Sequence, residues 1–132
     1  MKPLTVVSVE RYAPDDDAAS VTLRSDQGEV TVFCWPCSVK AGDVVMNRLS
    51  AMDGEVGGAY GVDWPQGEKD AASAEQLERT GHYAYRGRGR VAKASEGLVE
   101  TMGFLIEFGE TPETGHVEFD IARLDCGCDT LD

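Results

Sequence analysis

The stretch HYAYRGRGRVAKASEGLVETMGFLIEFG, residues 82–109, decides which fold is predicted. Glu96 and Gly97 are typical of a turn, and antiparallel pairing around them predicts one long curved hairpin. In this register apolar side chains lie over the bare backbone of two glycines, as in bent sheets. The predicted cross-strand pairs are Val91 with Met102, Gly89 with Phe104, Gly87 with Ile106 and Tyr85 with Phe108. One face of the hairpin is therefore expected to be continuously apolar.

Alternation of apolar and polar residues predicts further strands on both sides of this stretch. The expected strands are residues 4–12, 20–25, 29–34, 43–49 and 116–125. In the last of them the alternation changes phase between Ile121 and Leu124, which predicts a bulge near Ala122. Residues 68–80 are rich in good helix formers and are followed by Gly81, so they predict a helix.

This order of elements resembles the layout of an OB-type barrel, and the turn AGDVV, residues 41–45, is frequent in such barrels. The resemblance implies an all-β fold with one short helix: an OB-like, partly open barrel of about five to seven mainly antiparallel strands. A chain of 132 residues suits a single domain, residues 1–132. We expect a flexible C-terminal tail at residues 126–132.

The composition is strongly acidic, with 24 Asp and Glu against 12 Lys and Arg and a formal net charge of -12. Such a field repels phosphate backbones, which disfavours nucleic-acid binding, and it attracts a basic protein partner. A solvated surface without a partner is the alternative. The N-terminal residues do not form a signal-peptide core, and no stretch approaches the roughly 20 apolar residues of a membrane span. A cytoplasmic protein is therefore expected.

Four cysteines raise the question of a metal site. Cys34 and Cys37 form a C-x-x-C half-site, which Cys126 and Cys128 could complete as structural zinc. Against zinc, C-x-C is a less common spacing, and Cys34 continues the alternation of a strand as a buried thiol would. Disulfides are not expected where thiols are kept reduced, and the segment after Cys37 lacks the helix of a thioredoxin-like redox site. The main expectation is buried thiols without a cofactor, with structural zinc as the alternative.

Three arginines, Arg86, Arg88 and Arg90, project to one side if their segment is a strand. They could bind a phosphate, a carboxylate ligand or single-stranded nucleic acid. The alternative is neutralisation within the protein, for example by Glu107 across from Arg86 in the predicted register.

A catalytic residue set is not recognisable in this sequence. His82 and His116 are the only side chains suited to act as a base near neutral pH, and neither lies in a nucleophile motif. The predicted function is therefore a non-enzymatic binding module that engages a protein partner through an acidic surface, as an inhibitor or neutralising partner does. The alternatives are an oligonucleotide-binding or small-anion-binding protein that uses the Arg86, Arg88 and Arg90 face, and a low-turnover enzyme.

Overall fold

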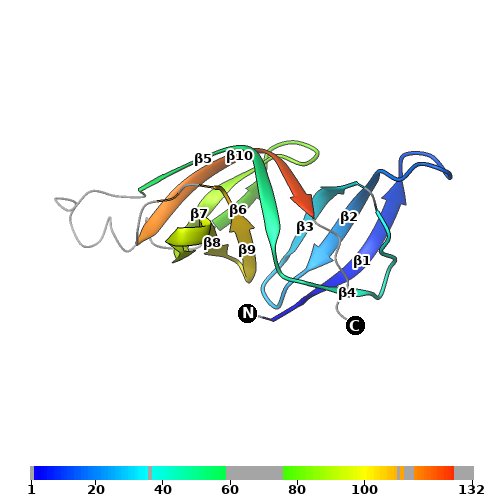
Figure 1. Cartoon of the computed structure of the whole chain (residues 1–132), viewed down its shortest axis with the longest axis horizontal. Helices are drawn as coiled ribbons and strands as arrows, with labels where there is room; N and C mark the ends of the chain where they lie inside the picture. Colours follow the sequence, from blue (N-terminus) through cyan, green and yellow to red (C-terminus); the bar gives the residue numbers. More distant parts are fainter. Residues whose placement is uncertain (1, 36, 59–75, 110, 112–114, 127–132) are drawn as a thin grey trace.

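The computed structural model describes residues 2–35, 37–58, 76–109, 111 and 115–126. Ten strands dominate this part of the chain (Figure 1). They are β1 (Leu4–Arg11), β2 (Ala19–Arg24), β3 (Glu29–Cys34), β4 (Val44–Val45), β5 (Leu49–Gly58), β6 (Gln76–Arg79), β7 (Tyr85–Lys93), β8 (Leu98–Thr101), β9 (Phe104–Glu107) and β10 (His116–Cys126). A 3₁₀ turn, η1 (Ala94–Glu96), lies between β7 and β8. None of the described helical segments is long and apolar enough to cross a membrane.

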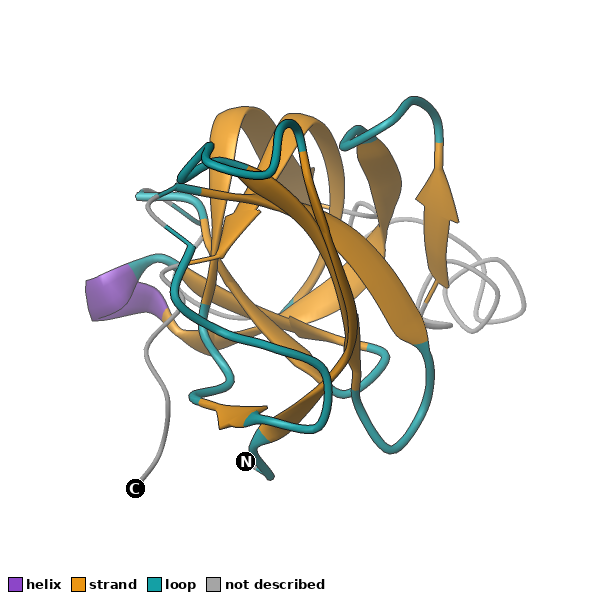
Figure 2. Cartoon of the chain, turned by 90° about the vertical axis from the view of Figure 1, so that its right-hand side faces the viewer, coloured by secondary structure: helices purple, strands orange, loops and turns teal. Residues whose placement is uncertain are grey.

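Five strands close into a barrel in the order β10, β5, β9, β8, β7 and back to β10. The pairing of β5 with β9 is parallel and the other four pairings are antiparallel. Figure 2 shows the strands wrapped around a common interior. The prediction of an all-β, OB-like barrel is confirmed, because the ring is OB-like in its number of strands and in its closure.

The other strands extend this ring at two places. β1, β2 and β3 form an antiparallel meander with β4 on its outer edge, and β3 joins the barrel by a short parallel pairing with β10. β6 adds to the barrel by pairing with β7. The sheet therefore keeps two edge strands, β4 and β6, among the described residues, as expected for a partly open barrel.

The hydrophobic core runs through both parts of the sheet as one cluster. The alternation that predicted β2 and β3 is seen in burial, since Val21, Leu23 and Val32 are fully buried while Thr22 and Thr31 are half-buried on the other face. Phe104, Ile106 and Ile121 fill the barrel interior and are fully buried. Burying each such side chain contributes about 1.5–3 kcal/mol.

The predicted register of residues 82–109 is wrong, and none of the four predicted pairs forms: Gly89 and Gly87 of β7 lie opposite Val117 and Phe119 of β10, while β9 pairs with β8. Met102 and Gly103 have φ values of 48° and 82°, and Thr101 pairs with Phe104, so these residues form a two-residue turn between β8 and β9. Consecutive positive φ values are typical of tight hairpin turns. Val91 therefore faces Val99 instead of Met102. The expected turn at Gly97 is present, with φ 65°.

The helix predicted for residues 68–80 is wrong at its C-terminal end, because Gln76–Arg79 form β6; residues 68–75 lie outside the described residues. Leu77 of β6 pairs with Gly87 and packs against the core. Pairing with β7 has therefore overridden the local helix propensity.

The change of phase in β10 is seen in burial, since Ile121 and Leu124 are both fully buried although they are three residues apart. The predicted bulge near Ala122 is absent from the pairing with β5, because Ile121 faces Gly54 and Arg123 faces Met52 in one unbroken register. β10 continues to Cys126, which is buried, so this residue belongs to the sheet and not to the predicted tail. Residues 127–132 lie outside the described residues.

Candidate functional site: a charged groove on the barrel

A groove of about 700 Å³ lies on the outer face of β5, β10, β7 and β6. Side chains of the four strands line it in two cross-strand rows. The first row is Glu55, Asp120, Arg86 and Glu78, and the second is Gly57, Glu118, Arg88 and Gln76. We call these eight residues the charged groove. Its four carboxylates and two guanidinium groups give it a net charge of -2.

The arginines of β7 lie on one face, as predicted, and each forms an ion pair with a glutamate. Arg86 Nε lies 3.1 Å from Glu78, Arg88 lies 2.9 Å from Glu118 and Arg90 lies 3.1 Å from Glu100. Arg90 lies outside the groove lining. The predicted pairing of Arg86 with Glu107 is wrong. β9 is paired with β8 through the turn at Met102 and Gly103, and Glu107 forms its ion pair with Arg48. A role of the three arginines in binding anions or nucleic acid stays a prediction.

Unlike Glu78 and Glu118, the groove acids Glu55 and Asp120 have no arginine partner among the described residues. They lie directly opposite each other on β5 and β10, and both are exposed. Neither forms an ion pair with any described residue. Directly opposed side chains are about 4.5–5.5 Å apart at Cβ, and like charges at this distance destabilise a sheet. Arg86 is the other neighbour of Asp120, but its Nε is directed to Glu78.

The predicted cysteine ligands are partly brought together. Cys34 and Cys126 are direct neighbours on β3 and β10, and Cys37 belongs to the same core cluster; Cys128 lies outside the described residues. Cys34 takes part in a disulfide, contrary to the expectation of reduced thiols, whereas Cys37 and Cys126 do not. Within the described residues no three His, Cys, Asp or Glu side chains converge on a possible metal position. Zinc binding stays a prediction, and it requires reduced Cys34 because only a thiolate binds zinc.

A second polar cluster, which the sequence did not reveal, joins the barrel to the meander. Ser20 Oγ on β2 lies 3.1 Å from His82 Nε2 and 2.5 Å from the Tyr83 hydroxyl, which in turn contacts the Tyr12 hydroxyl. The partners are more than 60 residues apart in sequence, and no local pattern links them.

A second neighbour of His82, Arg79, bears on the tautomer of the His82 ring. Arg79 Nη2 lies 3.4 Å from His82 Nδ1, and a guanidinium can only donate, so Nδ1 accepts this hydrogen bond. A neutral His82 ring then carries its proton on Nε2 and donates it to Ser20 Oγ. In this tautomer His82 donates to the Ser20 hydroxyl, which also lies within hydrogen-bond distance of the Tyr83 hydroxyl.

Desolvation and the hydrogen bond with Tyr83 raise the pKa of Tyr12 from 10.0 to about 12. Below pH 10 the phenol is protonated in both the folded and the unfolded chain. Between pH 10 and about 12 the unfolded chain loses this proton first, so the free energy of unfolding is expected to fall as pH rises. Urea unfolding at a series of alkaline pH values should show a shallower fall for Tyr12→Phe. An equal fall in both proteins would contradict the role given to Tyr12.

Comparison with known proteins gives no relative from which a function could be transferred. No family model matches the chain, and neither a curated protein nor a solved structure matches it.

Proposed function

We propose that this protein is a binding module that holds a basic, extended segment of a protein partner in the charged groove. The observation that supports this proposal most directly is the opposed pair Glu55 and Asp120, two exposed carboxylates without an ion pair among the described residues. The remaining acids of the groove, Glu78 and Glu118, already have arginine partners. Two cationic groups of a ligand would complete the charge pattern of the groove.

The shape of the groove favours an extended ligand. Its floor consists of neighbouring strands, so carboxylates recur at the spacing of a sheet across β5, β10 and β6. A lysine or arginine above Glu55 and Asp120 would relieve their repulsion, and this relief adds to the attraction exerted by a net charge of -12. Opposed like charges reduce stability without a ligand, and such a cost is typical of functional sites.

The first test measures binding of a fluorescein-labelled peptide of alternating lysine and threonine by fluorescence anisotropy at low ionic strength. Glu55→Gln combined with Asp120→Asn is expected to weaken binding about tenfold, because two exposed charge pairs are lost. The same double variant is expected to be more stable by about 0.2–1 kcal/mol in urea unfolding, since the repulsion is removed.

A matched control has the same change in net charge away from the groove. Glu10→Gln combined with Asp26→Asn alters two exposed acids outside the groove lining and is expected to leave peptide binding within about twofold of the parent. Equal losses in both double variants would mean that only net charge attracts the peptide. This result, or a groove variant that binds as well as the parent, would overturn the proposed function.

A further inference from the structure

A group of aromatic side chains lies on the outer face of the meander, away from the charged groove. Tyr12 and Trp35 are 55% and 67% exposed, the two most exposed large hydrophobic side chains among the described residues. Arg11, Ala19 and Cys34 form one cross-strand row, and Tyr12 and Trp35 each follow this row by one residue, so both lie at the same end of the meander.

Two half-buried rings, Phe33 and Tyr83, contact Tyr12. Phe33 lies 6.1 Å from Tyr12 and 5.7 Å from Tyr83, measured between ring centroids. Arg123 stacks over Phe33 at 4.7 Å and is held by two hydrogen bonds to Asp125, at 2.7 and 2.9 Å. We call Tyr12, Phe33, Trp35 and Tyr83 the aromatic patch.

The chemistry of the aromatic patch restricts its ligand. The hydroxyls of Tyr12 and Tyr83 are hydrogen-bonded to each other, and Tyr83 is also hydrogen-bonded to Ser20. A ligand would therefore contact the patch mainly through the faces of its aromatic rings. Tyr, Trp and Arg are also the residues that dominate binding energy at protein interfaces. An exposed Trp beside an exposed Tyr suits a ligand with apolar rings, and proline-rich segments use such aromatic surfaces because their extended conformation is already formed.

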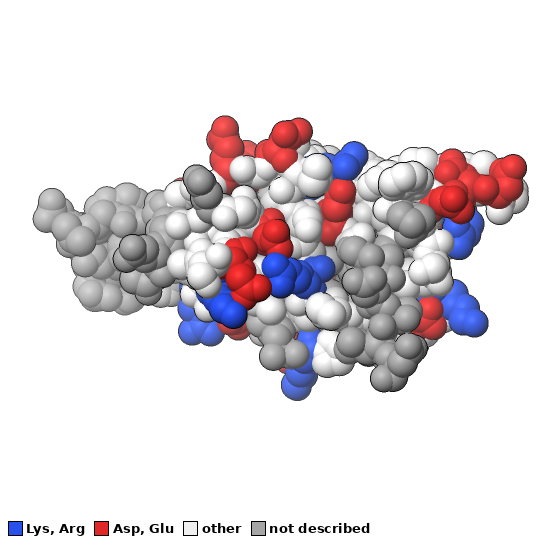
Figure 3. Space-filling view, in the orientation of Figure 1, with Lys and Arg blue, Asp and Glu red and all other residues white. Residues whose placement is uncertain are grey.

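The connection that follows Tyr12, residues 13–18, contains three aspartates and no basic residue. Asp15 and Asp17, in the connection that follows Tyr12, are exposed and form no ion pair with another described residue. Figure 3 shows acidic side chains at the right-hand end of the molecule, where the connection between β1 and β2 lies in Figure 1. A second copy of this chain is a poor occupant because it carries the same net charge of -12. Charge complementarity requires a ligand with basic residues.

We propose that the aromatic patch binds a proline-rich segment that carries arginine. Prolines pack against Tyr12 and Trp35, while the arginines face Asp15 and Asp17. This second site does not depend on the charged groove, since the two surfaces share none of the residues named for them.

The test titrates the whole protein with a fluorescein-labelled proline-rich peptide that ends in two arginines and follows fluorescence anisotropy. Trp35→Ala is expected to weaken binding by about tenfold or more, the scale of a tryptophan at the centre of an interface. Because Trp35 is 67% exposed, its removal should leave the thermal unfolding midpoint unchanged. Asp15→Asn with Asp17→Asn should weaken binding and reduce its dependence on salt.

Controls separate this proposal from unspecific attraction and from the groove. Met46→Ala changes an exposed apolar side chain outside the aromatic patch, and Glu55→Gln with Asp120→Asn changes the groove; both variants should bind as the parent does. Tyr12→Phe keeps the ring and should also bind. A peptide with glycine in place of proline should bind at least about tenfold more weakly. The proposal is overturned if the proline peptide does not bind, if Trp35→Ala binds as the parent does, or if the glycine peptide binds equally well.

Discussion

Gly89→Ala is expected to destabilise the protein by about 3 kcal/mol, because a side chain at this position overpacks the barrel. A Cβ on Gly89 would lie 2.4 Å from Glu100 O and 3.0 Å from Val99 Cγ1. Both contacts belong to β8, which is held between β7 and β9. A backbone oxygen inside a closed ring of strands cannot move aside without breaking hydrogen bonds, so β7 and β8 must separate. Urea or guanidinium unfolding gives the difference in free energy.

The matched control for this substitution is Gly57→Ala in β5. A Cβ on Gly57 would have no atom within 4 Å, so the expected change is about 0.5 kcal/mol or less. Gly87 provides a useful comparison, since its Cβ would lie 2.0 Å from Gln76 O in β6, which is an edge strand. β6 can detach more easily than β8, so Gly87→Ala should cost less than Gly89→Ala. If Gly89→Ala and Gly57→Ala are equally stable, β8 is not packed on β7 as described.

Asn47→Leu is expected to cost about 3 kcal/mol, because the side chain of Asn47 satisfies three backbone groups at a buried position. Its Nδ2 donates to Gly103 O at 2.8 Å and to Lys2 O at 3.0 Å, and Leu105 N donates to its Oδ1 at 3.0 Å. Asn47 is 6% exposed, so water cannot replace these bonds fully. The residue thereby ties the turn between β8 and β9 to the N-terminal segment.

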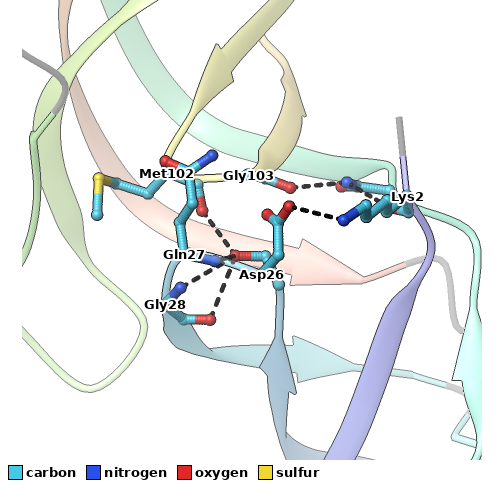
Figure 4. A network of polar contacts seen from close by, with 8 residues as sticks. Lys2, Asp26, Gln27, Gly28, Met102 and Gly103 are labelled. Atoms are coloured by element: carbon cyan, nitrogen blue, oxygen red, sulfur yellow. Dashed lines mark hydrogen bonds and ion pairs between the residues drawn. The ribbon is translucent and has the colours of Figure 1, made fainter.

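Figure 4 shows the surroundings of this turn, with Met102 and Gly103 beside the turn formed by Asp26, Gln27 and Gly28. Ser25 Oγ donates to Met102 O at 2.7 Å, and Lys2 pairs with Asp26 at 3.5 Å. The control is Gln27→Ala, because only the backbone of the exposed Gln27 contributes a hydrogen bond in this network. We expect Gln27→Ala to change the free energy of unfolding by no more than about 0.5 kcal/mol. A similarly small effect of Asn47→Leu would show that the turn does not depend on Asn47.

Local sequence patterns were sufficient for much of the fold. Alternation predicted β2 and β3, and it also predicted the change of phase in β10 between Ile121 and Leu124, because burial on one face leaves a direct trace in sequence. The turn at Met102 and Gly103 was missed because this pair lacks the Asn-Gly or Asp-Gly signature of tight hairpins. β6 was missed because residues 76–79 have helix-forming composition and become a strand only through pairing with β7.

The candidate site was predictable only in part, because local patterns place side chains within one strand but do not determine which strands are paired. The strand pattern placed Arg86 and Arg88 on one face, and this placement depends on neighbouring residues alone. Their glutamate partners and the opposed pair Glu55 and Asp120 come from strands that are distant in sequence. Register between such strands is set by closure of the barrel, which no local pattern encodes.

The measurement that tests the proposed function most directly is a titration of ¹⁵N-labelled protein with the lysine–threonine peptide, followed by amide chemical shifts. The groove proposal predicts saturating shifts at Glu55, Gly57, Glu118 and Asp120, and at their neighbours on β6 and β7. Raising the salt concentration should reverse these shifts, since the attraction is electrostatic. Shifts concentrated around Asp15 and Asp17, or no saturating shifts on β5 and β10 at low salt, would contradict the proposal.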